Sequence, residues 1–119
     1  MSYLEKINDI YDKIAKGEAM DAFEEYYEED VVMIMEDGTP VEGKETNRDR
    51  ENDFFSSVEE FHGIEVKALT SNEEEGTTSA ESVMDVTFKG GDRQKMAQVA
   101  VQHWDGDQIK KERFYASQN

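Results

Sequence analysis

The order of the apolar patterns along the chain constrains the fold more than any single motif does. Near the N-terminus, Ile7, Ile10 and Ile14 recur at steps of three and four residues, as on one face of a helix. Later, residues 82–88 alternate with the two-residue period of a strand, and residues 96–104 form another strand that is apolar on both faces. Helices followed by several strands predict an α+β fold, in which helices gather on one side of a sheet and leave room for a cavity.

Two helices are expected before the first strand. Ser2 and Glu5 have the spacing of a capping box and Gly17 is a suitable end, so the first helix should span residues 3–16. Apolar residues repeat the helical spacing after Gly17, and this second helix should end near Asp30.

Turn residues divide the rest of the chain. An apolar run at residues 31–35 predicts the first strand, and residues 37–40 break it with turn chemistry. The polar segment 42–57 is expected to form a third helix. The later strands, of which the last is residues 109–115, are separated by three polar turns at residues 72–76, 90–92 and 105–107.

Length and composition exclude several classes of protein. The 119 residues suit one domain, residues 1–119, and the absence of cysteine leaves no disulfide or thiolate chemistry. No apolar run is long enough for a membrane span and no signal peptide opens the chain, so we expect a cytoplasmic protein without a membrane partner. A net charge of −16 argues against a nucleic-acid partner, because phosphate contacts need clustered Lys and Arg.

The acidity is unevenly distributed. Residues 1–60 hold 19 acidic and 6 basic residues, a balance of −13, whereas residues 61–119 hold 10 and 7, a balance of −3. Like charges repel, so self-association should use the second half of the chain, which forms the sheet.

Four segments, taken in their order, resemble the SnoaL-like branch of the nuclear transport factor 2-like superfamily. They are residues 17–23, 27–32, 41–44 and 104–115. The resemblance implies a cone-shaped, curved antiparallel or mixed sheet with the N-terminal helices packed on its concave face. It also implies a pocket between the first helix, the third helix and that face, although the third helix is longer and more polar than is usual in the family. The superfamily contains both enzymes and binding domains, so membership does not fix the function.

The resemblance, with the alternation of side chains along a strand, indicates which residues should face the pocket. The expected ligand-binding residues are Met33, Met35, Met84, Met96, Gln98, Gln102, Trp104 and Phe114. Val99 and Val101 would then face outward. Two exposed valines predict that a second copy of the chain covers this face, giving a homodimer through the sheet.

Tyr11 and Glu112 are the candidate catalytic residues. By resemblance, Tyr11 falls where ketosteroid isomerases carry the Tyr that donates to the oxyanion, and Glu112 in an apolar pocket should have a raised pKa. Each also has a structural interpretation, as a Tyr packed on a helix face and as a Glu bonded to an Arg or to Gln102. Isomerase activity is not expected, because the position of the general base aligns with Met35 and that of the second oxyanion donor with Ala100.

No metal or cofactor is expected. The two histidines, His62 and His103, lack metal-ligand spacing, and the chain has no nucleotide-binding fingerprint. Three functions stay open: a domain that binds a small, largely apolar molecule, a polyketide-cyclase- or dehydratase-like enzyme with Glu112 as acid or base, and a dimerisation or partner-binding module with a filled pocket.

Overall fold

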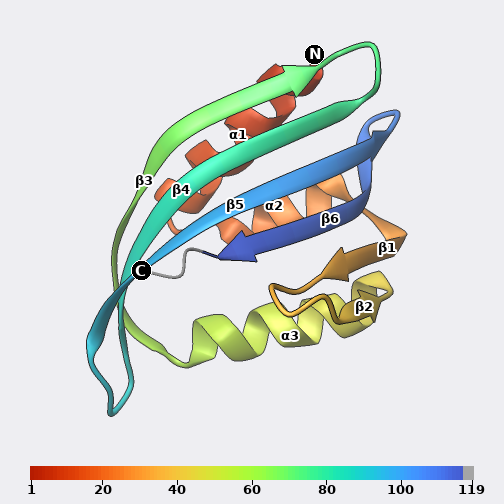
Figure 1. The fold of residues 1–119 in the computed structure, drawn as a ribbon. Coiled ribbons are helices and arrows are strands. Elements are labelled where there is room, and N and C mark those ends of the chain that lie inside the picture. The colour runs from red at the N-terminus through yellow and green to blue at the C-terminus, as the bar shows by residue number, and fades with distance from the viewer. Residues whose placement is uncertain (117–119) are drawn as a thin grey trace.

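The computed structural model describes residues 1–116, which form three helices and six strands (Figure 1). The helices are α1 (Tyr3–Ala15), α2 (Ala19–Tyr26) and α3 (Lys44–Ser56). The strands are β1 (Tyr27–Ile34), β2 (Pro40–Glu42), β3 (Val58–Asn72), β4 (Thr77–Phe88), β5 (Arg93–Asp105) and β6 (Gln108–Ala116). This is the α+β class that the order of the apolar patterns predicts.

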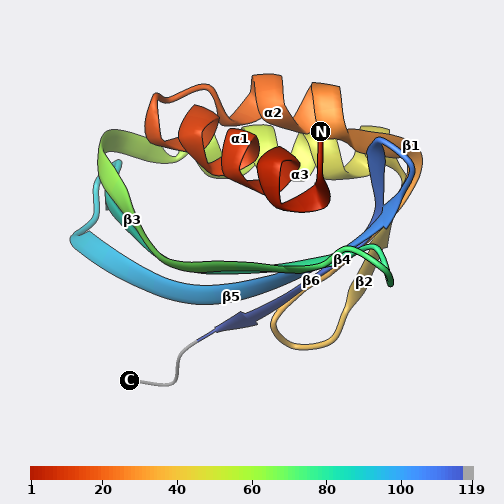
Figure 2. The ribbon, with the colours of Figure 1, turned by 90° about the horizontal axis from the view of Figure 1, so that it is seen from above.

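All six strands belong to one sheet, in the order β2-β1-β6-β5-β4-β3. Neighbouring strands are antiparallel except β1 and β6, which are parallel. The sheet is strongly curved, and the three helices lie together on its concave side (Figure 2). The predicted cone with a mixed sheet is therefore confirmed.

The capping signals of α1 act as predicted. The Ser2 hydroxyl accepts a hydrogen bond from the Glu5 N–H at 3.0 Å, and the Glu5 carboxylate accepts one from the Ser2 N–H at 2.9 Å. The helix ends just before Gly17, which adopts a φ of +78° that other residues rarely reach. Ile7 and Ile10 are buried on the face of α1 that packs against the core.

The predicted end of the second helix near Asp30 is wrong. α2 ends at Tyr26, and residues 27–30 belong to β1. The first strand therefore spans residues 27–34 instead of the predicted 31–35. Tyr27 is buried and aligns with Ile109 of the parallel strand β6. This pairing of Tyr27 with a strand from the opposite end of the chain outweighs the local preference for a longer helix.

α3 buries polar side chains instead of an apolar stripe. The buried Lys44 Nζ donates to the Glu24 carbonyl oxygen at 2.9 Å. The buried Asn47 Nδ2 donates to the carbonyl oxygens of Val41 and Gly43 at 3.0 and 2.9 Å. These bonds give partners to groups whose burial would otherwise be costly. The polar segment predicted as a helix can therefore pack without a continuous apolar face.

The other predicted elements are present, but several bounds differ, since the predicted strands 82–88 and 96–104 lie within the longer β4 and β5. α3 occupies residues 44–56 of the predicted 42–57, because residues 40–42 pair with β1 as the short strand β2. The three predicted turns separate β3 from β4, β4 from β5, and β5 from β6. Within residues 1–116, none of the helices has the length and apolar character needed to cross a membrane.

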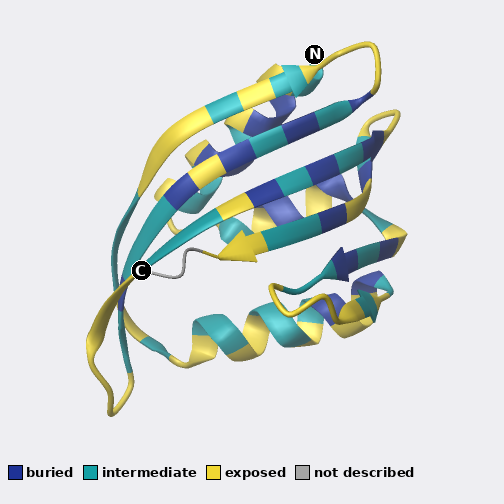
Figure 3. Cartoon of the chain, in the orientation of Figure 1, coloured by how far each residue is buried: buried dark blue, intermediate teal, exposed yellow. Residues whose placement is uncertain are grey.

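Alternation along β4 and β5 separates an inner from an outer face of the sheet (Figure 3). On the inner face, Ala80, Val86 and Ala100 are almost fully buried. On the outer face, Val99 is 37% exposed and Val101 is half-buried. The predicted assignment of these two valines to the outer face is confirmed.

Candidate functional site

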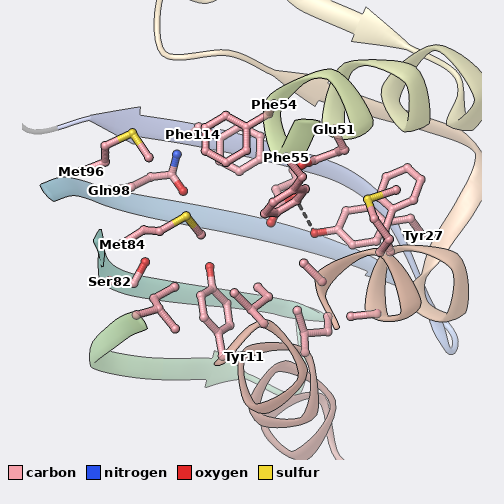
Figure 4. A pocket seen from close by; sticks show the side chains of 18 of the residues that line it. Tyr11, Tyr27, Glu51, Phe54, Phe55, Ser82, Met84, Met96, Gln98 and Phe114 are labelled. Carbon is pink, nitrogen blue, oxygen red and sulfur yellow. Dashed lines mark hydrogen bonds between the residues drawn. The ribbon is translucent and has the colours of Figure 1, made fainter. Parts of the chain in front are cut away.

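A cavity of about 190 Å³ lies between the three helices and the concave face of the sheet (Figure 4). Most of its wall consists of aliphatic and aromatic side chains. The polar side chains that border it, besides Tyr27, are Tyr11, Arg50, Glu51, Ser82, Gln98 and Glu112. A mostly apolar cavity with a few convergent polar groups has the character of a small-molecule site.

Six of the ten predicted site residues border this cavity: Tyr11, Met84, Met96, Gln98, Glu112 and Phe114. The other four do not: Met33, Met35, Gln102 and Trp104. Met33 is covered by α3, where Arg50 Nη2 lies 3.4 Å from its sulfur. Trp104 packs against the rings of Tyr3 and Tyr26. The alternation of a strand predicts the face of a residue correctly, but the helices decide which part of that face stays open.

Glu112 ends a buried chain of hydrogen bonds. Trp104 Nε1 donates to Thr78 Oγ1 at 2.9 Å, and the Thr78 hydroxyl donates to Gln102 Oε1 at 2.7 Å. Gln102 Nε2 then donates to Glu112 Oε2 at 2.6 Å, and the Tyr27 hydroxyl donates to Glu112 Oε1 at 2.6 Å (dashed line in Figure 4). Both carboxylate oxygens therefore have partners. Gln102, which was expected to line the pocket, does not border the cavity and instead donates a hydrogen bond to the carboxylate that does.

Burial changes the acidity of Glu112. Desolvation raises its pKa from 4.5 to about 7, because the charged form loses its solvating water. The hydrogen bonds from Gln102 and Tyr27 oppose this rise, and the nearby Glu51 adds to it. The raised pKa and the bond to Gln102, expected as alternatives from the sequence, occur together. A carboxyl group with a pKa near 7 can give or take a proton at neutral pH.

Glu51, a second carboxyl group that was not among the predicted site residues, reaches the cavity from α3. It is largely buried, and desolvation raises its pKa. Arg50 Nη2 lies 3.2 Å from its Oε1. The spacing of Glu51, Phe54 and Phe55, at steps of three and four, is the signal that could have placed it on the inner face of the helix.

Tyr11 projects from α1 into the cavity (Figure 4). Burial raises the pKa of its hydroxyl, and the charge of Glu112 adds to the rise, while the nearby Ser82 hydroxyl opposes it. Tyr11 therefore stays neutral and can donate a hydrogen bond to an acceptor on a ligand. Gln98 lies on the opposite wall, where its Nε2 donates to Glu36 Oε1 at 3.2 Å.

The two histidines lie away from the cavity. His62 Nε2 is 2.7 Å from Thr87 Oγ1. His103 has a lowered pKa because of partial burial and, secondarily, because of Lys111, its neighbour on β6. In the described part of the chain, no three His, Asp or Glu side chains come together in a way that could hold a metal ion.

Comparison with known sequences assigns the family. Residues 3–116 match the sequence profile of the SnoaL-like domain. The chain belongs to the SnoaL-like family. This match confirms the resemblance that the four sequence segments carry. No curated protein matches the sequence significantly.

Solved structures of other SnoaL-like and related proteins share the fold. A candidate SnoaL-like polyketide cyclase from Mesorhizobium loti is 25% identical, with a TM-score of 0.80 over 97% of this chain and 99% of that chain. A candidate polyketide cyclase from Pseudomonas putida is 19% identical, with a TM-score of 0.83 over 100% and 94%. A candidate isomerase from Bacillus subtilis is 16% identical, with a TM-score of 0.80 over 98% and 90%. The variety of these names agrees with a fold that serves several activities.

Proposed function

We propose that this SnoaL-like domain binds a small, largely apolar molecule in the cavity beneath its helices. The cavity itself is the observation that supports the proposal, because large side chains such as Met84, Met96 and Phe114 border the space without filling it. An empty apolar cavity costs packing contacts, so an occupant would stabilise the folded chain. The alternative of a dimerisation or partner-binding module with a filled pocket is less well supported, because side chains do not fill this cavity.

A small neutral fluorophore tests this proposal. 1-Aminonaphthalene, which is uncharged at neutral pH, should bind saturably with one molecule per chain. Met84→Trp should lower its affinity by about tenfold or more, a loss of roughly 1.4 kcal/mol, because the indole occupies the cavity. Val83→Trp is the matched control, since Val83 is the adjacent residue on the outer face of β4. Non-saturable binding, or equal effects of the two substitutions, would contradict the proposal.

A second candidate function is acid–base catalysis of the cyclase or dehydratase type. The observation that favours it is the pKa of about 7 of Glu112, a residue that borders the cavity. Glu112 would transfer a proton while the Tyr11 hydroxyl bonds a carbonyl oxygen of the substrate. Glu112 Oε1 already accepts a hydrogen bond from Tyr27, so a proton would be exchanged at a lone pair that this bond leaves free.

Turnover of small carbonyl compounds tests this second candidate. The rate should follow an ionisation near pH 7, and Glu112→Gln should abolish turnover while 1-aminonaphthalene still binds. Tyr11→Phe should weaken the binding of carbonyl ligands by about 1 kcal/mol, the net contribution of one hydrogen bond. Turnover that survives Glu112→Gln would contradict the assignment of the acid or base.

We further propose that the domain forms a homodimer through the outer face of the sheet. Val99 and Tyr115 are paired across β5 and β6, and they are 37% and 48% exposed. The helical half of the chain carries a balance of −13 and repels a second copy, whereas the half that forms most of the sheet carries only −3. A two-fold interface brings the same face of each copy together and keeps the acidic helices apart.

A further inference from the structure

The charges that border the cavity are not balanced. Among the described residues that line it, Glu51 and Glu112 are acidic and Arg50 is the basic one. The guanidinium of Arg50 is shared, because its Nη2 lies 3.4 Å from Asn47 Oδ1 and 3.2 Å from Glu51 Oε1. With both carboxyl groups ionised, one negative charge remains without a partner of opposite sign. In a largely apolar space such a charge favours a bound cation.

Glu51 and Glu112 differ in how much bonding capacity they have left. The two oxygens of Glu112 accept hydrogen bonds of 2.6 Å from Tyr27 and Gln102. Glu51 has one longer contact, at 3.2 Å, with its neighbour Arg50. Figure 4 shows Glu51 beside Phe55 at the cavity wall. Glu51 is therefore the carboxylate that a ligand can reach without breaking a buried network.

The wall also offers aromatic rings to a cation. Six of the lining residues are aromatic: Tyr11, Phe23, Tyr27, Phe54, Phe55 and Phe114. The face of an aromatic ring attracts a positive charge electrostatically, most strongly where water is excluded. The same rings accept an apolar group, so they suit both parts of a molecule that joins an ammonium group to an apolar body.

We propose that the cavity selects a ligand with an ammonium group on an apolar body, and that Glu51 contacts the ammonium group. This inference rests on the proposed binding function and names the chemical class of its ligand. An uncharged ligand of the same shape would leave the negative charge of the cavity uncompensated, so it should bind more weakly.

A proton on Glu112 competes with this cation. The titratable and charged groups that face Glu112 are Tyr27 from β1, Tyr11 from α1, and Arg50 and Glu51 from α3. From β5 the uncharged Gln102 bonds Glu112, and the uncharged Ser82 of β4 and Gln98 of β5 border the same cavity. Protonation of Glu112 removes one negative charge, so affinity for an ammonium ligand should fall as the pH drops below about 7. A neutral ligand should show no such dependence.

A matched pair of compounds tests the proposal: benzyltrimethylammonium, and neopentylbenzene, which has the same shape with carbon in place of nitrogen. Both are measured by competition against 1-aminonaphthalene. At pH 8 the cation should bind about tenfold tighter or more than its neutral counterpart, as expected for one partly buried ion pair with a carboxylate. At pH 6 the advantage should shrink about fivefold or more. Glu51→Gln should remove the preference, and Glu45→Gln, at an exposed position of the same helix, should keep it.

The outcomes separate this inference from the proposed function. Equal affinity for both compounds in the wild-type protein, or a preference that survives Glu51→Gln, overturns the ammonium proposal. Saturable binding of the neutral compounds would still support the cavity as a binding site. Failure of all three compounds to bind overturns the proposed function and the inference with it. If Glu51→Gln proves unfolded by circular dichroism, the wild-type pair at pH 8 and pH 6 decides, and a preference unaffected by pH counts against the proposal.

Discussion

The Tyr27 hydroxyl donates a 2.6 Å hydrogen bond to Glu112 Oε1, joining the parallel strands β1 and β6 at the wall of the cavity. Burial raises the pKa of both groups, and the charge of Glu112 raises that of Tyr27 further. Tyr27 therefore remains a neutral donor, and its bond partly offsets the rise in the pKa of Glu112. Through this contact, the stability of the fold depends on the ionisation of Glu112 at the cavity wall.

The effect of Glu112 on stability should depend on pH. Its pKa rises from 4.5 to about 7 on folding, so its contribution to stability is fully present below about 4.5 and is lost as the pH rises through 7. Glu112→Gln removes this loss. As the pH rises from 4.5 to 7.5, the free energy of unfolding of the variant minus that of the wild type should increase by up to about 3 kcal/mol. Urea denaturation across this range measures the difference.

Glu45→Gln is the control for that series, because Glu45 is exposed on α3 and the chemical change is identical. Its difference from the wild type should stay within about 0.5 kcal/mol at every pH. A Glu112→Gln variant that instead loses stability relative to the wild type as the pH rises would show that Glu112 is a stabilising charge.

Tyr27→Phe should raise the pKa of Glu112 further, because it removes a hydrogen bond that favours the carboxylate. It should also destabilise the fold by about 1–3 kcal/mol, since Oε1 is left buried without its donor. NMR titration of the labelled Glu carboxyl group and chemical denaturation measure the two effects. Tyr11→Phe removes a hydroxyl from the same cavity without touching that bond, and an equal pKa shift in both variants would refute the role of Tyr27.

Asn47→Ala should destabilise the protein by about 2 kcal/mol. Asn47 is fully buried, and its Nδ2 donates to the carbonyl oxygens of Val41 and Gly43 where the chain enters α3. Thr46→Ala, at an exposed position of the same turn, should change stability by less than about 0.5 kcal/mol. Thermal and urea denaturation of the two variants test this, and similar stabilities would show that the buried amide is not needed.

The proposed dimer should be sensitive to charge on the outer face of the sheet. Light scattering at micromolar concentration should give about two chains for the wild type, and Val99→Lys should give one, because a buried lysine without a partner is costly. Leu4→Lys is the control, since Leu4 is also 37% exposed but lies on α1. A monomeric wild type, or a dimer that tolerates Val99→Lys, rules out this interface.

Local patterns were sufficient to predict much of the fold. The capping box of Ser2 and Glu5 and the alternation that turns Val99 outward involve residues close together in the chain. The match of residues 3–116 to the SnoaL-like family confirms the resemblance read from four segments. Short-range geometry determines such features, so the sequence by itself was enough to determine them.

Contacts between distant segments decided the rest. Tyr27 pairs with Ile109 of β6 and α2 ends at Tyr26, although the local sequence favours a longer helix. The way α3 covers the cone excludes Met33 from the cavity and brings Glu51 to it. Pairing and packing energies between segments exceed local preferences of a few tenths of a kcal/mol per residue. Local sequence patterns therefore determine the class of fold, whereas tertiary packing determines the shape and charge of the cavity.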